Sequence, residues 1–96
     1  MRSIPREVLA RWAAAHPTVR TLYVFGSYAR GDAYAESDLD LAFDFTDSTE
    51  ALSELIENAA PWKAELTRLT GIKVKDLYLS TDPPAQGPKL EVFRRE

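Results

Sequence analysis

The chain of 96 residues has the length of one small domain, and we expect residues 1–96 to form it. It contains no cysteine, which excludes disulfides and thiolate metal sites, and no apolar run approaches the roughly 20 residues of a membrane span. With 12 basic and 15 acidic residues, the net charge of −3 argues against strong nucleic-acid binding. No signal-peptide pattern follows the N-terminus, so we expect a cytoplasmic protein without membrane association.

The N-terminal part of the chain predicts a helix followed by a strand. Residues 5–16 place apolar side chains at helical spacing, with one proline at the first helical position and another directly after the segment. Residues 18–25 are rich in β-branched and aromatic side chains, as strands are. Gly26 and Ser27 then lead into a short helical turn at residues 28–30.

Residues 38–45 alternate strictly, which is typical of a strand with one packed face and one polar face. The predicted polar face consists of Asp38, Asp40, Ala42 and Asp44, and the packed face consists of Leu39, Leu41, Phe43 and Phe45. This strand therefore presents several carboxylates on one side of the predicted sheet.

A long helix is predicted for residues 52–69, which keep helical spacing. A capping-box pattern runs from Asp47 to Glu50 before it, and Gly71 suits its C-terminal cap. Pro61 should kink this helix or begin a second one.

The last third of the chain predicts a third strand and a short final helix. In the strand, residues 73–80, the side chains of Val74, Asp76 and Tyr78 should share a face, and the amphipathic residues 89–96 fit a helix. The order of elements predicts an α+β fold of two layers, a small mixed sheet with helices on one face and the other face partly open.

Gly26 and Ser27 suit a turn that binds phosphate. Glycine lets the backbone approach a ligand closely, and the start of the following helical turn presents unpaired N–H groups. The Ser27 hydroxyl adds a further donor, so this turn fits the β- and γ-phosphates of a nucleotide.

Asp38 and Asp40 suit magnesium, which prefers hard oxygen ligands. Because the two residues are two positions apart on a strand, their Cα atoms lie about 6–7 Å apart and their side chains point to the same face. The two Mg²⁺ ions of nucleotidyl transfer lie about 3.5–4 Å apart, so carboxylates at this spacing can bridge them. For a third carboxylate we prefer Asp76 in the next strand to Asp44, which lies about 13 Å from Asp40 along the same strand.

The pattern Gly26-Ser27, ten residues, then Asp38-Leu39-Asp40 resembles the signature of the nucleotidyltransferase superfamily related to DNA polymerase β. At average residue usage, such a match arises by chance in about one chain in a thousand of this length. The short length, with the likeness over residues 18–80, resembles the minimal nucleotidyltransferases (MNT). Members of that group are commonly paired with small helical HEPN proteins in toxin–antitoxin modules.

This resemblance implies that the chain has a nucleotidyltransferase fold. It also implies that the chain is an adenylyltransferase, which uses ATP with two Mg²⁺ ions. Its implied acceptor is a hydroxyl, namely a tyrosine of a HEPN-type toxin. Six residues receive roles from it: nucleotide binding by Gly26, Ser27 and Arg30, and catalysis with metal ligation by Asp38, Asp40 and Asp76. Tyr28 is a further candidate to line the nucleotide pocket.

Two other interpretations stay open at this point. The chain can act as a non-catalytic antitoxin that neutralises its partner by binding alone. It can also be an adenylyltransferase for a small molecule such as an aminoglycoside, although such enzymes carry an additional acceptor-binding domain. The sequence leaves the acceptor, the nucleotide preference and homo-oligomerisation undetermined.

Overall fold

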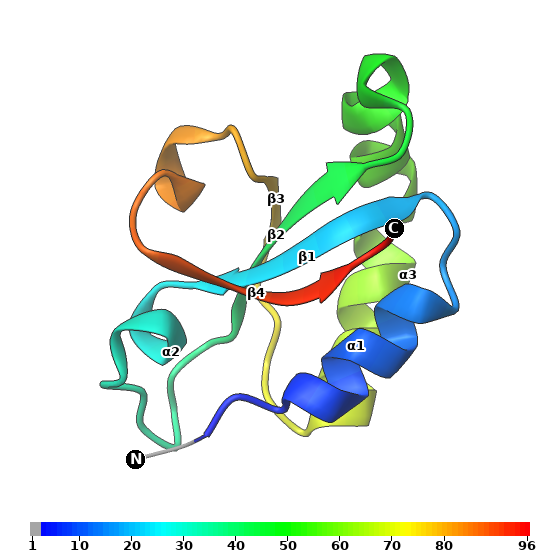
Figure 1. The fold of residues 1–96 in the computed structure, drawn as a ribbon. Coiled ribbons are helices and arrows are strands. Elements are labelled where there is room, and N and C mark those ends of the chain that lie inside the picture. The colour runs from blue at the N-terminus through cyan, green and yellow to red at the C-terminus, as the bar shows by residue number, and fades with distance from the viewer. Residues whose placement is uncertain (1–2) are drawn as a thin grey trace.

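The computed structural model describes residues 3–96. Its helices and strands are α1 (Arg6–Ala14), β1 (Val19–Phe25), α2 (Ser27–Arg30), β2 (Asp40–Phe45), α3 (Ala51–Thr70), β3 (Leu77–Leu79) and β4 (Lys89–Arg94) (Figure 1). Two 3₁₀ turns, η1 (Ser48–Glu50) and η2 (Pro83–Ala85), precede α3 and β4. The predicted α+β class is confirmed. None of the helices in the described part of the chain is long and apolar enough to cross a membrane.

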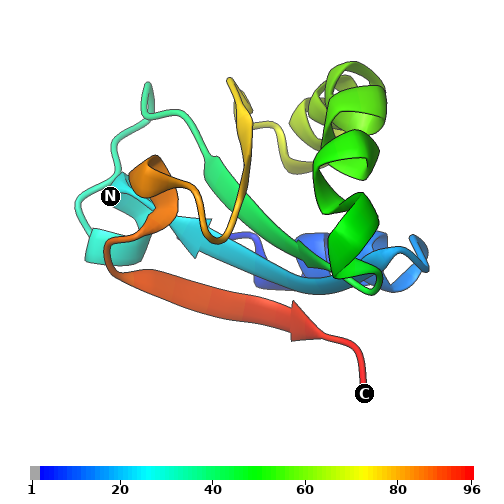
Figure 2. The ribbon, with the colours of Figure 1, turned by 90° about the horizontal axis from the view of Figure 1, so that it is seen from above.

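The strands form one mixed sheet in the order β3-β2-β1-β4. β1 pairs antiparallel with both β2 and β4, whereas β2 and β3 are parallel and are connected through α3. Leu41 pairs with Leu77, so the N-terminal ends of β2 and β3 lie next to each other. Figures 1 and 2 place α2 and η2 at one end of the sheet, with α1 and α3 toward the other end.

The main hydrophobic core lies between the sheet and the helices α1 and α3. As the alternation predicts, the packed face of β2 contributes to it. The buried residues that fill this core include Leu9 and Trp12 of α1, Leu22 and Val24 of β1, Leu41, Phe43 and Phe45 of β2, and Leu55, Trp62 and Leu66 of α3. A smaller cluster of Phe25, Ala42 and Ala85 lies on the other face, where η2 covers part of the sheet.

The C-terminal segment forms β4, so the predicted helix at residues 89–96 is wrong. Pairing with β1 satisfies the backbone groups on one edge of β4, and Val92 and Phe93 pack against the main core. The Arg95 guanidinium then donates hydrogen bonds to the carbonyl oxygens of Ala13, His16 and Val19, at 2.9, 3.1 and 3.0 Å. These tertiary contacts outweigh the weak helical pattern of a short segment.

The long helix is continuous through Pro61, so the alternative of a second helix is wrong. Trp62 and Leu66, which are buried just after the proline, hold the helix against the core on that side. Gly71 ends α3 with a φ of +73°, as predicted. Asp47 accepts a hydrogen bond from the Thr49 amide at 3.1 Å, but it caps η1 rather than the first turn of α3.

Candidate functional site

Gly26 forms the turn between β1 and α2. Its backbone has φ +72° and ψ −148°, a combination that is nearly confined to glycine. A Cβ at this position would overlap the carboxylate of Asp40, which begins the neighbouring strand. The backbone conformation therefore favours glycine here, and any side chain at this position would have to displace the Asp40 carboxylate.

α2 begins directly at Ser27, and its first amides have no preceding helical carbonyl with which to pair. Gly31 ends this short helix in the left-handed conformation, with φ +81°. The Arg30 side chain extends from the last residue of α2, and its Nε lies 3.4 Å from Oδ2 of Asp32. Both partners of this ion pair are more than half exposed, so Arg30 remains accessible to a ligand.

Asp38 and Asp40 flank Leu39, which is fully buried in the main core. The Leu39 amide donates a hydrogen bond of 2.8 Å to the carbonyl oxygen of Lys73, which ties this segment to the chain that leads into β3. Because Leu39 is anchored inward, both carboxylates lie on the outer side. β2 starts at Asp40 rather than at Asp38, yet the predicted alternation of the two faces holds.

Asp76 lies directly before β3. Since Leu41 pairs with Leu77 in parallel register, the preceding residues Asp40 and Asp76 are neighbours at the same end of the sheet. The strand predicted at residues 73–80 is limited to Leu77–Leu79, and the prediction that Val74 shares a face with Asp76 and Tyr78 is wrong. Val74 is buried in the main core, because the chain before β3 is irregular and does not alternate like a strand.

All six predicted site residues line one open cleft of about 470 Å³ at the α2 end of the sheet. These residues are Gly26, Ser27, Arg30, Asp38, Asp40 and Asp76. Three further residues that the sequence interpretation missed complete the lining, namely Ser37, Lys75 and Tyr78. Period-two spacing from Asp76 is the signal that could have identified Tyr78 as a lining residue.

The crowding of carboxylates changes the acidity of Asp40. Partial burial raises the pKa of its carboxyl above the ordinary value, the nearby charges of Asp38 and Asp76 raise it further, and Arg30 opposes them. Burial also raises the pKa of the Tyr78 hydroxyl, together with the negative charges of Asp76 and Asp40. The cleft is therefore an environment in which negative charge is unfavourable until a cation enters.

The oxygen-rich lining fits Mg²⁺ by its chemistry but does not form a closed cage. Within residues 3–96, no three acidic or histidine side chains are arranged to hold a metal ion by themselves. Mg²⁺ is ordinarily bound by one or two carboxylates together with substrate phosphates and water, rather than by protein groups alone. Asp38 and Asp40, beside the Gly26 turn, provide that partial set of ligands.

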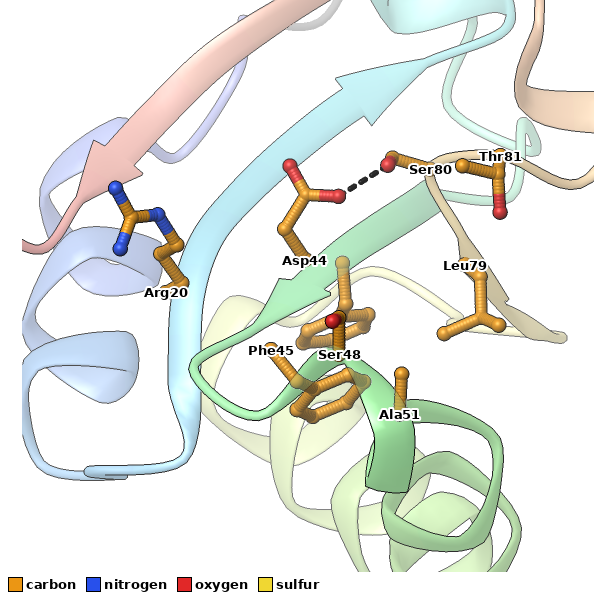
Figure 3. A pocket seen from close by; sticks show the side chains of 9 residues that line it. Arg20, Asp44, Phe45, Ser48, Ala51, Leu79, Ser80 and Thr81 are labelled. Atoms are coloured by element: carbon orange, nitrogen blue, oxygen red, sulfur yellow. Dashed lines mark hydrogen bonds between the residues drawn. The ribbon is translucent and has the colours of Figure 1, made fainter.

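Asp44, the competing third carboxylate, lies outside the cleft. Its Oδ2 accepts a hydrogen bond of 3.0 Å from the Tyr23 hydroxyl, and its Oδ1 accepts one from the Ser80 hydroxyl. These bonds place Asp44 beside a second hollow of about 390 Å³ at the far end of β2, where Arg20 also lies (Figure 3). The structure thus brings Asp76, and not Asp44, next to Asp38 and Asp40.

Tyr28 does not line the cleft, so the prediction that it lines the pocket beside Gly26 and Ser27 is wrong. Its side chain turns inward into the main core and is 3% exposed. Its hydroxyl is buried and has no hydrogen-bond partner among residues 3–96. The Tyr28 ring packs from α2 into the main core, and the aromatic residue at the cleft is Tyr78 instead.

Comparison with known proteins gives two findings. A family described as "Polymerase beta, Nucleotidyltransferase" matches residues 7–86. A solved structure described as "Crystal structure of the toxin-antitoxin with AMP-PNP" has a similar fold, with a TM-score of 0.70 and 15% sequence identity over 97% of this chain and 76% of that chain. No curated protein matches the sequence significantly.

Proposed function

Because the chain belongs to the polymerase β-type nucleotidyltransferase family, we propose that it transfers AMP from ATP to a hydroxyl acceptor in a Mg²⁺-dependent reaction. The observation that carries this proposal is the convergence of the Gly26–Ser27 turn with three carboxylates in one cleft. A phosphate-binding turn beside clustered acidic groups is what a nucleoside triphosphate with its metal ions requires.

Each of the six site residues that the sequence predicts receives a role in this proposal. The Gly26 backbone and the Ser27 hydroxyl bind the β- and γ-phosphates, and Arg30 contacts the triphosphate from the end of α2. Asp38 and Asp40 hold Mg²⁺, with Asp76 as the third carboxylate. Bound Mg²⁺ supplies charge neutralisation for the phosphates and for the leaving pyrophosphate.

Asp76 orients the acceptor hydroxyl and accepts its proton. The acceptor oxygen then attacks the α-phosphorus, a new P–O bond forms, and the bond between the α-phosphorus and its bridging oxygen breaks. The products are the adenylylated acceptor and pyrophosphate, and the proton is held on Asp76 until solvent removes it. Burial and the charges of Asp38 and Asp76 raise the pKa of Asp40, and a bound cation would offset this unfavourable charge.

For the acceptor we propose a tyrosine of a small helical toxin of the HEPN type, with this chain as its antitoxin. Support comes from the similar fold of a protein described as a toxin–antitoxin with AMP-PNP, and from the likeness of the sequence to minimal nucleotidyltransferases. The cleft is open, so it can receive a side chain that another protein presents.

Two measurements test the proposal. Calorimetry with ATP and Mg²⁺ should show binding to the wild type and a loss of at least tenfold in affinity for an Asp38→Asn, Asp40→Asn variant. Asp44→Asn is the matched control, because Asp44 lies on the same strand face outside the cleft, and it should bind like the wild type.

In the second measurement, the protein is incubated with α-³²P-labelled ATP and a small helical HEPN-type protein, the partner that we propose. Label on the toxin supports transfer. Neutralisation of the toxin by the Asp38→Asn, Asp40→Asn variant without any label would instead support the non-catalytic antitoxin. Wild-type protein that binds neither ATP nor Mg²⁺ would refute the proposed function.

A further inference from the structure

The order of the strands sets a direction across the cleft. The Gly26–Ser27 turn follows β1, Asp40 begins β2, and Asp76 precedes β3, with β2 lying between the other two strands. In an in-line transfer, the acceptor attacks the α-phosphorus from the side opposite the leaving pyrophosphate. If the proposed function holds, pyrophosphate leaves at the β1 side, so the acceptor enters over β3.

Tyr78 is the aromatic side chain at that entrance. It is in β3, two residues after Asp76, and the two residues line the same cleft. Residues two apart along a strand have Cα atoms about 6–7 Å apart and side chains on the same face. The Tyr78 ring is only half-buried, and no hydrogen bond of its hydroxyl is found in the described range 3–96.

The Tyr78 ring is held in place by packing on its inner side. Tyr78 pairs in register with Ala42, which is fully buried and has only a methyl group. The small Ala42 leaves room for the rings of Phe25 and Tyr78 to meet edge to face, with centroids 5.4 Å apart and planes at 78°. Ala85 of η2 belongs to the same apolar cluster. One side of the ring is therefore supported, and the other side faces the cleft.

We propose that Tyr78 forms the wall of the acceptor subsite and favours a planar, aromatic acceptor, the phenol of a tyrosine side chain, over an aliphatic hydroxyl. A supported ring beside Asp76 allows an incoming phenol to pack against it while its hydroxyl reaches the carboxylate. Aromatic pairs of this kind change an affinity by about three- to tenfold beyond simple burial of area.

The test uses two small acceptors, N-acetyl-tyrosinamide and N-acetyl-serinamide, with ATP and Mg²⁺. Tyr78→Leu removes the ring and Tyr78→Phe keeps it, and Tyr34→Leu is the control, since Tyr34 is 73% exposed and lies outside the cleft. Tyr78→Leu should raise the KM for N-acetyl-tyrosinamide about three- to tenfold. Tyr78→Phe and Tyr34→Leu should change it by less than about twofold, and the Kd for ATP with Mg²⁺ should not change in any variant.

A second readout needs neither nucleotide nor activity. In an NMR titration of the metal-free wild type, N-acetyl-tyrosinamide should shift the ring resonances of Tyr78 and Phe25, whereas N-acetyl-serinamide should leave them unchanged. This measurement also decides the question if Tyr78→Leu fails to fold.

Three outcomes would overturn the inference while the proposed function stands. They are an unchanged acceptor KM in Tyr78→Leu, equally efficient use of N-acetyl-serinamide by the wild type, and transfer to neither acceptor by protein that binds ATP with Mg²⁺. Weaker ATP binding in Tyr78→Leu at an unchanged acceptor KM would assign the ring to the nucleobase instead. If the wild type itself binds neither ATP nor Mg²⁺, the proposed function is refuted. A failure of the proposed function can therefore be distinguished from a failure of the inference about Tyr78.

Discussion

The carboxylate of Asp40 occupies the space that a side chain on Gly26 would need. Phe25 and Asp40 are paired across β1 and β2, so the residue after Phe25 turns directly past the start of the next strand. The turn that we assign to phosphate and the carboxylate that we assign to the metal are therefore in contact before any ligand enters. Because of this contact, a single methyl group added at Gly26 should displace the Asp40 carboxylate from its place in the cleft.

Gly26→Ala should destabilise the fold and abolish nucleotide binding. The strained backbone alone costs about 1–3 kcal/mol, and about 4–8 °C of melting temperature is lost per kcal/mol in a domain of this size. Gly31→Ala is the matched control, because Gly31 also has a positive φ but nothing lies within 4 Å of a Cβ there. Thermal unfolding followed by circular dichroism should show a larger loss for Gly26→Ala. Equal losses would contradict the proposed collision with Asp40.

Asp76→Asn should preserve folding and ATP binding but lower the rate of transfer. The amide has the shape of the carboxylate, but it cannot accept the proton of the acceptor hydroxyl. Loss of a general base typically lowers a rate by about 10²–10⁴-fold. Asp44→Asn should leave the rate near that of the wild type, since Asp44 lies outside the cleft. Comparable rates for Asp76→Asn and the wild type would remove Asp76 from the mechanism.

Asp40→Asn should stabilise the metal-free protein at neutral pH. The pKa of Asp40 is raised in the folded state, mainly by burial and then by Asp38, so the folded state binds this proton more tightly than the unfolded chain. Ionisation therefore lowers stability. This loss of folding stability is absent below the pKa of the unfolded chain, about 3.9. It grows as the pH rises through the pKa of Asp40 in the folded state.

The melting temperatures of the wild type and of Asp40→Asn should accordingly coincide near pH 3 and diverge in favour of Asp40→Asn toward pH 7. Saturating Mg²⁺ with ATP should reverse the difference, because only the wild type binds the ion tightly. Glu36→Gln, an exposed acidic residue outside the cleft, should show no such divergence. A wild type more stable than Asp40→Asn without metal at pH 7 would be inconsistent with an unfavourable charge.

Arg95→Ala should destabilise the protein by about 1.5–3 kcal/mol, the range for hydrogen bonds that involve a charged group. Its guanidinium donates hydrogen bonds to the carbonyl oxygens of Ala13, in the last turn of α1, and of His16, just after the helix, and so connects the end of β4 to that helix. Arg94→Ala is the comparison, because Arg94 is exposed and its guanidinium pairs with Glu91, three residues away. Chemical unfolding should show a clear loss for Arg95→Ala and little change for Arg94→Ala.

Tyr28→Phe should stabilise the protein. The Tyr28 hydroxyl is buried without a hydrogen-bond partner in the described range, and such a group costs about 1–3 kcal/mol. Removal of the oxygen keeps the ring in the core and should raise the melting temperature by roughly 4 °C or more. Tyr78→Phe, at the half-buried ring of the cleft, should not have this effect. A lower melting temperature for Tyr28→Phe would indicate an ordered water on the hydroxyl.

Much of the fold can be predicted from the sequence because the relevant signals are local. The alternation of residues 38–45 depends only on the geometry of a single strand, so the residue pattern alone predicts that Leu39 and Leu41 point inward and that Asp38 and Asp40 point outward. The resemblance of the Gly26–Ser27 to Asp38 spacing to the nucleotidyltransferase signature predicts a shared site, and these residues do line one cleft. Their roles in binding and catalysis stay a prediction.

Only the tertiary structure decided which distant segments meet. The parallel pairing of β2 with β3 places Asp76 beside Asp40, and Tyr78 at the cleft in place of Tyr28. Residues 89–94 form a strand because they pair with β1, although their sequence pattern fits a helix when taken alone. Pairing and burial depend on contacts between residues far apart in the chain, and no periodicity within a single segment contains that information.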